Sequence, residues 1–145
     1  MAENKPKFVA DASVLLKWAV YESEDFQQSL MFEDDVKKGK VDVFVPIHCF
    51  SEICNMLGRD RHSVAISFLS YLMHSDITEC GLSLNMSIVA FDLMKKYTKI
   101  SFYDAFYHAL AIRENAIFIT ADKKYYDKTR RRGHIMLLKN YGKKR

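Results

Sequence analysis

The chain has 145 residues, of which 49% are hydrophobic and 13% aromatic, which suits one compact domain with a packed core. This apolar content excludes a chain that is disordered throughout. The net charge of +4 does not by itself indicate nucleic-acid binding. Nine of the 22 basic residues lie in segments 122–134 and 141–145, where a solvated surface and a nucleic-acid-binding surface both stay open as interpretations.

The apolar pattern alternates between short buried strands and longer helices. Phe8–Ala10 is predicted as a strand, and Ser23–Lys40 as a helix with Ser23 at its N-cap. The β-branched run Val41–Val45 is predicted as a second strand. A helix is predicted over Pro46–Gly58, with one apolar face formed by Ile47, Phe50, Cys54 and Leu57.

The second half of the chain repeats this alternation. Ser63–His74 is predicted as a helix whose wide apolar surface should be buried within the domain or against a partner. Asn115 is expected to take the left-handed conformation that ends a helix. The other predicted elements are an extended piece at Ile77–Leu82, helices at Ser83–Thr98, Ser101–Asn115 and Asp122–Gly133, and strands at Ala116–Thr120 and His134–Leu138.

Continuous apolar strands that alternate with helices predict the α/β class, with a mostly parallel sheet covered by helices on both faces. We expect a single domain over residues 1–145, with a basic tail from about 139 to 145. In such sheets, functional sites form outside the carboxyl ends of the strands.

The cysteines and the hydropathy indicate where the protein works. Cys49, Cys54 and Cys80 are an odd set without CxxC spacing, which favours free thiols in a reducing cytoplasm over disulfides or a zinc site. The longest uncharged run, residues 62–75, is shorter than the roughly 20 apolar residues that a membrane span needs. We recognise no secretory leader. A cytoplasmic protein without a membrane segment is therefore expected.

Four acids fall where such a sheet would gather them. Asp11 and Asp122 each follow a predicted strand, Asp104 lies in the first turn of a predicted helix, and Glu52 lies in the middle of another among apolar neighbours. Converging carboxylates repel one another unless a cation lies between them. Oxygen ligands suit Mg²⁺ or Mn²⁺. The ordinary alternatives are that the aspartates cap helices or favour the helix dipole.

Four segments carry a family resemblance: "FVADASVLLKW", "PIHCFSEICNML", "SFYDAFYHALA" and "AIFITADKKYY". Their order and spacing resemble those of PIN-domain proteins, and most of all the VapC-type ribonuclease toxins of toxin–antitoxin pairs. The resemblance implies a three-layer α/β/α fold with a central sheet of four to five strands. It also implies hydrolysis of RNA phosphodiester bonds with Mg²⁺ or Mn²⁺, and catalytic, metal-binding roles for Asp11, Glu52, Asp104 and Asp122.

The resemblance extends to residues that would contact substrate. Ser13 matches a small hydroxyl residue near the metal or the scissile phosphate, and Thr120 matches the hydroxyl of a T-x-D ending. Lys123 and Lys124 would hold RNA phosphates if they lie beside the site. The chain has Asn115-Ala116 where many relatives have glycine.

Other candidates near the motifs have ordinary interpretations. His108 is expected to be a partly buried histidine that donates to a neighbour, with a ligand or general-base role as the alternative. Tyr103 and Tyr107 are expected to be packing residues. Asp127 competes with Asp122 as the fourth acid; if Asp122 only caps a helix, a three-acid site remains.

The family resemblance implies partners as well as chemistry. It implies a homodimer and a small antitoxin protein. Two alternatives stay open: a non-catalytic RNA- or protein-binding scaffold, and an RNA-processing nuclease without a toxin role. Haloacid-dehalogenase-type phosphatases fit less well because they require an aspartate where Ser13 stands. Receiver domains usually have paired acids at the first strand, where Ala10 precedes Asp11.

Overall fold

A five-stranded parallel sheet forms the centre of the molecule in the computed structural model, which describes residues 4–20 and 24–143. The strand order is β3-β2-β1-β4-β5, so β1 lies in the middle. The strands are β1 (Lys7–Ala10), β2 (Asp42–Pro46), β3 (Thr78–Cys80), β4 (Ile117–Thr120) and β5 (Ile135–Leu137). The predicted α/β class and strand number are confirmed.

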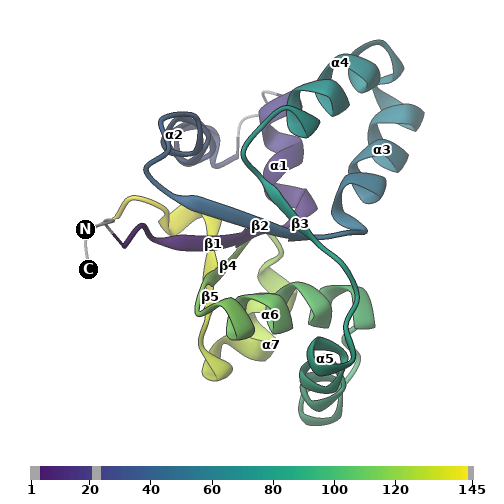
Figure 1. Ribbon diagram of the computed structural model, residues 1–145, viewed down its shortest axis with the longest axis vertical. Helices are drawn as coiled ribbons and strands as arrows, with labels where there is room; N and C mark the ends of the chain where they lie inside the picture. The colour runs from purple at the N-terminus through teal and green to yellow at the C-terminus, as the bar shows by residue number, and fades with distance from the viewer. Residues whose placement is uncertain (1–3, 21–23, 144–145) are drawn as a thin grey trace.

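Helices cover both faces of the sheet (Figure 1). One layer contains α1 (Ala12–Ala19), α2 (Phe26–Lys37), α3 (Cys49–Asp60) and α4 (His62–Met73). The other contains α5 (Leu84–Lys96), α6 (Phe102–Glu114) and α7 (Lys123–Thr129). Short 3-10 turns follow at Arg130–Arg132 and Leu138–Asn140. The arrangement is the expected three-layer α/β/α fold.

The core is built around the central strand and its aromatic neighbours. Val9 and Ala10 of β1 are fully buried, as expected for a strand with helices on both faces. Phe32 of α2 packs edge-on against Phe8, with the ring centroids 5.5 Å apart. On the other face, Tyr107 of α6 stacks on Phe118 of β4 at 5.4 Å. Aromatic side chains thus pack on one face of the sheet at β1 and on the other face at β4.

The N-terminal helices differ from the sequence prediction in their extents. Helix α1 was not among the predicted elements, because its eight residues are fewer than the roughly 11 to 18 over which a helical period is read. Helix α2 begins at Phe26, and the predicted N-cap Ser23 lies outside the described residues. Pro46 does not begin a helix: it is the last residue of β2 and pairs with Cys80 of β3.

The later start of α3 changes which of its residues are buried. Ile47 precedes the helix and is 59% exposed, and Cys54 is only partly buried. Phe50, Ile53 and Leu57 instead form the buried stripe, at the spacing expected of one helix face. The prediction of an apolar face through Ile47 and Cys54 is therefore wrong.

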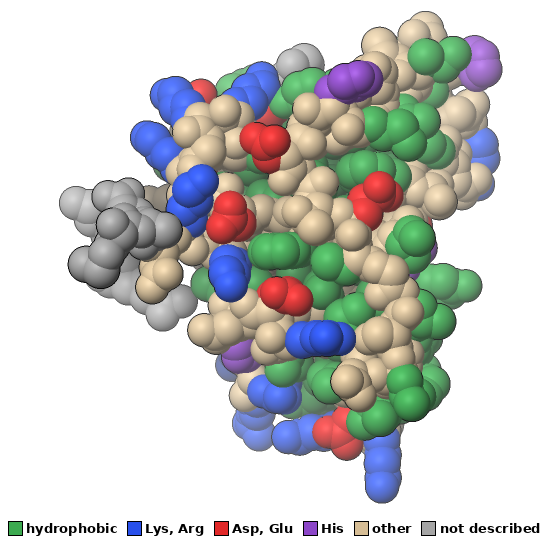
Figure 2. All heavy atoms as spheres, viewed as in Figure 1, with side chains coloured by type: hydrophobic (Ala, Val, Ile, Leu, Met, Phe, Trp, Pro, Cys, Tyr) green, Lys and Arg blue, Asp and Glu red, His purple; other side chains and the backbone are tan. Residues whose placement is uncertain are grey.

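Helix α4 exposes much of its apolar surface. Only Phe68 and Leu72 are buried, whereas Ile66 is 84% exposed and Met73 63% exposed. Figure 2 shows hydrophobic side chains also gathered on the surface over α5, where Leu84, Ile88 and Phe91 are exposed. Helix α4 is therefore buried within the domain only through Phe68 and Leu72, and a partner surface stays open as an interpretation of its exposed apolar side chains.

The C-terminal segment is anchored to the domain. Tyr141 is buried, packs against Phe8 and Phe32, and donates a hydrogen bond of 2.6 Å to the Asp35 carboxylate. The basic tail therefore does not leave the domain at residue 139. Cys49, Cys54 and Cys80 are free thiols. Among the described helices, none is long and apolar enough to cross a bilayer.

Asn115 ends α6 in the left-handed conformation, with a φ of 52°. This confirms the prediction from sequence and shows how the turn into β4 forms without glycine. The left-handed conformation of Asn115 turns the chain back, so that the Ala116 N–H donates to the carbonyl of Ala111 at 2.8 Å.

We expect Asn115→Ala to destabilise the protein by about 1 kcal/mol, because alanine loses the local polar contacts that make this conformation tolerable for asparagine. Asn115→Gly should keep wild-type stability. Urea unfolding of the three proteins measures the difference. Equal stability of the alanine and glycine variants would show that the turn does not depend on the left-handed residue.

Candidate functional site

The parallel pairing of β1 with β4 brings two predicted site residues together. The register sets Ala10 beside Ile119, and the Asp11 N–H donates to the Ile119 carbonyl at 3.0 Å. Asp11 and Thr120 therefore emerge side by side at the carboxyl edge of the sheet. This edge is where α/β folds place their sites.

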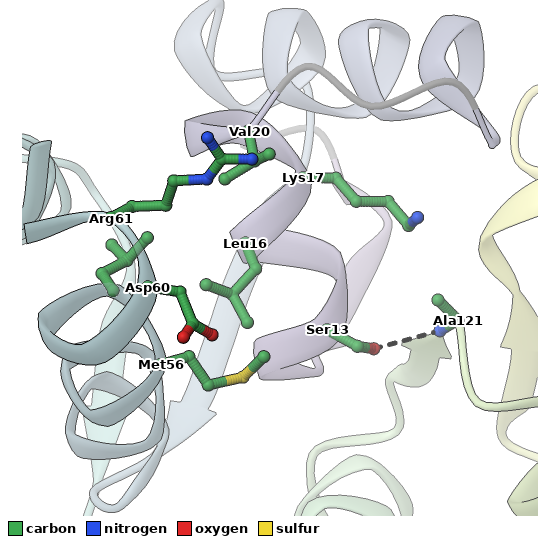
Figure 3. A pocket seen from close by; sticks show the side chains of 9 residues that line it. Ser13, Leu16, Lys17, Val20, Met56, Asp60, Arg61 and Ala121 are labelled. Atoms are coloured by element: carbon green, nitrogen blue, oxygen red, sulfur yellow. Dashed lines mark hydrogen bonds between the residues drawn. The ribbon is translucent and has the colours of Figure 1, made fainter.

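The Asp11 side chain does not cap the helix that follows it. No side-chain cap hydrogen bond is present at α1; instead, Ser13 Oγ and Thr120 Oγ1 both donate to Asp11 Oδ2, at 2.9 and 2.6 Å. Each hydroxyl in turn accepts a backbone N–H from the loop after β4, Ala121 at 3.3 Å (Figure 3) and Asp122 at 3.0 Å. The carboxylate is thereby fixed in orientation by two hydroxyls that the loop itself holds.

Glu52 lies in the first turn of α3, because that helix begins at Cys49, and not in mid-helix as predicted. Tyr107 of α6 donates its hydroxyl to Glu52 Oε1 at 2.9 Å. Sequence reasoning treated Tyr107 as a packing residue and missed this contact. Its position one turn after Asp104, on the same helix face, was the signal available.

His48 is a second neighbour of Glu52 that sequence reasoning missed. The His48 Nε2 atom lies 3.4 Å from Glu52 Oε1. Nε2 is buried and has no hydrogen-bond partner among the described residues. Burial lowers the pKa of His48, so the imidazole is neutral at neutral pH and the contact is not an ion pair. Rings of Tyr103, Phe106 and Tyr107 surround it edge-on.

Asp104 and Asp122 each lie at a helix N-terminus. The Asp104 N–H is capped by Ser101 Oγ at 3.0 Å, which leaves the Asp104 carboxylate free of a capping role. Asp122 is itself the N-cap of α7, because its Oδ1 accepts the Tyr125 N–H at 3.0 Å. The helix dipoles favour negative charge at both positions.

The four acids are coupled through their charges. The pKa of Asp11 is raised first by burial and also by the charge of Glu52. The pKa of Glu52 is raised by burial and then by Asp104, and the pKa of Asp104 by burial and then by Asp11 and Asp122. Segments far apart in the sequence are therefore brought into one electrostatic group.

The group is open and not a preformed metal cage. Within residues 4–20 and 24–143, no three Asp, Glu, His or Cys side chains lie close enough together to hold a metal ion. Glu52 and Asp104 line a shallow cleft of about 470 Å³ with His48, Tyr103 and neighbouring polar residues. Coupled carboxylates with oxygen-only donors fit a hard divalent cation, which would offset their repulsion.

His108 lies outside this group. It is fully buried; its Nε2 is 2.8 Å from the Gly133 carbonyl and its Nδ1 is 2.9 Å from the Tyr125 hydroxyl. Because a carbonyl can only accept, Nε2 carries the proton and Nδ1 accepts from Tyr125. Burial lowers the pKa of His108 to about 4, so it is neutral. The expectation of a buried histidine that donates to a neighbour fits this arrangement.

The remaining predicted residues lie on exposed surface. Asp127 pairs with Lys123 at 2.8 Å, and this ion pair lowers the pKa of Asp127. Asp122, and not Asp127, is the acid whose charge acts on Asp104. Lys123 and Lys124 are exposed at the start of α7, one and two residues after Asp122.

The fold places this protein among the three-layer α/β proteins. In such proteins, functional sites form at the carboxyl ends of the parallel strands, which is where the coupled acids lie here. More narrowly, residues 8–131 match the sequence profile of the PIN domain. The chain is a member of the PIN-domain family. No curated protein matches it by sequence.

Solved structures of the same fold include toxins and their complexes. VapC20 of Mycobacterium tuberculosis, described as a sarcin-ricin loop cleaving toxin, has a TM-score of 0.65 at 12% identity, covering 83% of this chain and 93% of that one. A toxin–antitoxin complex from Klebsiella pneumoniae gives 0.66 at 12% identity, with coverages of 90% and 96%. PAE2754 of Pyrobaculum aerophilum gives 0.62 at 20% identity, with coverages of 93% and 91%. These likenesses show the fold.

The charge coupling predicts how stability responds to Asp104. Because its folded-state pKa is raised above 3.8, the folded protein binds this proton more tightly than the unfolded chain does. The free energy of unfolding therefore falls as the pH rises from 3.8 through the raised pKa. We expect metal-free Asp104→Asn to be more stable than wild type at neutral pH, and this advantage to vanish near pH 3.8.

Thermal denaturation in EDTA at the two pH values measures this effect. Asp127→Asn is the matched control: the pKa of Asp127 is lowered by its pairing with Lys123, so its removal should not stabilise the protein. A less stable Asp104→Asn at neutral pH would contradict the coupling.

Proposed function

We propose that this PIN-domain protein is a metal-dependent endoribonuclease that hydrolyses RNA phosphodiester bonds, and that it is the toxin of a toxin–antitoxin pair. The observation that carries the proposal is the electrostatic coupling of Asp11, Glu52, Asp104 and Asp122 at the carboxyl edge of the sheet. Family membership supports a nuclease. A scaffold without catalysis would gain nothing from the repulsion between these acids.

In this proposal Asp11, Glu52, Asp104 and Asp122 hold Mg²⁺ or Mn²⁺. Such an ion, when bound, activates water and stabilises the negative charge that develops on the phosphate. Ser13 and Thr120 keep the Asp11 carboxylate oriented through the hydrogen bonds to its Oδ2. Tyr107 does the same for Glu52.

Substrate phosphates would be held by cations beside the acids. Lys123 and Lys124 follow Asp122 directly and are exposed, so they are placed to contact the RNA backbone. The ion pair of Lys123 with Asp127 is solvent-exposed and weak, so an RNA phosphate can replace the Asp127 carboxylate. Ser13 and Thr120 would lie near the scissile phosphate but act chiefly through Asp11.

We further propose two protein partners in the cytoplasm. A groove of about 340 Å³ between α1, α2 and α4, lined by Trp18, Val64 and Phe68 among others, would seat an antitoxin segment. The related fold in a toxin–antitoxin complex supports such a partner. The exposed apolar side chains of α5, Leu84, Ile88 and Phe91, would form a homodimer contact.

The first test compares wild type with Asp104→Asn on total RNA in Mg²⁺, Mn²⁺ or EDTA. We expect discrete cleavage by wild type that EDTA abolishes, and a loss of at least about 100-fold in Asp104→Asn, since even outer-shell changes cost roughly 10- to 100-fold. Asp127→Asn, which removes an acid outside the group, should cleave like wild type. Cleavage by Asp104→Asn at the wild-type rate would contradict the assignment.

Mn²⁺ titration of the same proteins separates the nuclease from a scaffold. A nuclease site should bind Mn²⁺ in wild type and gain thermal stability from it, whereas Asp104→Asn should bind it more weakly. No binding by wild type, together with no cleavage, would favour the non-catalytic scaffold.

The hydroxyl of Thr120 is predicted to be a positioning group. Thr120→Val should lower the cleavage rate and the Mn²⁺ affinity by roughly 10- to 100-fold, because Asp11 loses its shorter hydrogen bond. Thr120→Ser should restore both. Thr129→Val, the same change at another buried threonine whose hydroxyl donates to the Tyr125 carbonyl, is the control for general destabilisation. Equal losses in Thr120→Val and Thr129→Val would leave Thr120 with only a structural role.

A further inference from the structure

A second cleft lies beside Asp11, between α1 and α3 (Figure 3). Its volume is about 390 Å³, within the range of roughly 300–1,000 Å³ typical of small-ligand sites. Among the described residues, the side chains that line it include Ser13, Leu16, Lys17, Met56, Asp60 and Arg61. None of the four acids of the acid group lines it.

We infer that this cleft binds one nucleobase of the RNA, next to the scissile phosphate, and that Asp60 makes it selective for guanine. The inference rests on the proposed nuclease function, since it names the base that flanks the cleaved bond.

The position of the cleft ties it to the acid group. Ser13 and Ala121 line one side of it and are joined by a hydrogen bond of 3.3 Å (Figure 3). The same Ser13 hydroxyl donates to the Asp11 carboxylate at 2.9 Å. A nucleotide whose phosphate lies at Asp11 therefore has its base within reach of the cleft.

The walls of the cleft suit the flat faces of a base. Leu16 projects from α1 and Val20 from the residue that follows this helix, and Met56 projects from α3 toward Leu16 (Figure 3). Met56 is 47% exposed, although methionine usually fills gaps in cores. Apolar side chains on two sides can pack against both faces of a base, whichever base it is.

The charges at the rim suit the phosphates on either side of that base. Lys17 and Arg61 extend from opposite walls. Lys17 also lines a smaller cleft of about 150 Å³ with Lys123 and Lys139, where Glu24 and Asp25 are the acidic neighbours of these three cations. Within the described part of the chain, the Lys17 ammonium donates one hydrogen bond, to the Glu24 carbonyl at 3.3 Å on exposed surface, and a phosphate oxygen can replace this acceptor.

Asp60 supplies the polar group that can tell bases apart. Its carboxylate points between Leu16 and Met56 (Figure 3), and within the described residues it has no ion-pair or hydrogen-bond partner. An ionised carboxylate only accepts hydrogen bonds. Guanine presents two adjacent donors on its Watson–Crick edge, the N1–H and the 2-amino group. Adenine, cytosine and uracil each place an acceptor beside the donor, which the carboxylate repels.

The test measures binding of short uridine oligomers that carry one central guanine, adenine, cytosine or uridine. Ca²⁺ replaces Mg²⁺, because it is also a hard cation with oxygen ligands. We expect wild type to bind the guanine oligomer about tenfold or more tightly than the others, as for a bidentate contact to a base edge. Asp60→Asn should lose this preference. Lys17→Gln should weaken all four oligomers alike.

Asp76→Asn is the matched control, since it removes an exposed acid from the loop after α4 and should keep the guanine preference. Thermal melts establish that each variant is folded. Wild type without a base preference, or Asp60→Asn with the preference intact, would overturn the inference. Loss of antitoxin binding in Asp60→Asn with an unchanged base preference would also overturn it and assign the cleft to a protein segment.

RNA hydrolysis by wild type, measured separately, distinguishes this inference from the proposed function. Guanine-dependent binding without hydrolysis would support the base cleft and contradict the nuclease. Hydrolysis without a base preference would support the nuclease and contradict the base cleft.

Discussion

The hydrogen bond from Thr120 to Asp11 is the contact on which the site depends. It joins residues 109 positions apart, and it exists because β1 and β4 are adjacent parallel strands in a register that sets Ala10 beside Ile119. A slip of one residue would turn the side chains of β4 to the opposite face of the sheet and remove the Thr120 hydroxyl from Asp11. The burial of both strands, between two layers of helices, makes such a slip costly. Strand register therefore determines the geometry of the acid group.

The acid group lowers the stability of the folded state, and the rest of the fold compensates for this loss. Burial and mutual repulsion raise the pKa values of Asp11, Glu52 and Asp104, so their charged forms destabilise the folded state at neutral pH. Hydroxyl donors from Ser13, Thr120 and Tyr107 offset part of this cost and hold the carboxylates in place. Sites that are ready for a ligand commonly carry unfavourable energy of this kind.

The strands and the positions of the acids could be predicted because both follow from short-range patterns. Phe8–Ala10 and Ala116–Thr120 are continuous apolar runs, and the rule that sites lie at carboxyl edges then places Asp11 and Asp122. The sequence could indicate only that Tyr107 shares a helix face with Asp104; its contact with Glu52 joins two helices whose packing depends on the whole fold. Pro46 was misread for a local reason: a proline suits a strand end as well as a helix start.

The exposed face of α4 shows a second limit of sequence patterns. The wide apolar surface of this helix predicted that it is buried. Hydrophobicity alone does not tell whether the domain or a partner protein covers such a surface. Ile66 and Met73 are exposed to solvent in the single chain. The apolar pattern of this helix, which is typical of a buried element, therefore belongs partly to an exposed surface.

Under the two proposals made above, Ser13 would link recognition of the substrate to catalysis. Its single hydroxyl orients the Asp11 carboxylate and accepts the Ala121 N–H at one side of the α1–α3 cleft. A base seated in that cleft would pack against the same α1 turn that holds Asp11 in place. Loss of the Ser13 hydroxyl would therefore disturb the acid group and the base cleft together, whereas Asp60 and Thr120 each lie on one side only. If the base cleft and the acid group act as proposed, Asp60 would select the substrate, Thr120 would position the acids, and Ser13 would contribute to both.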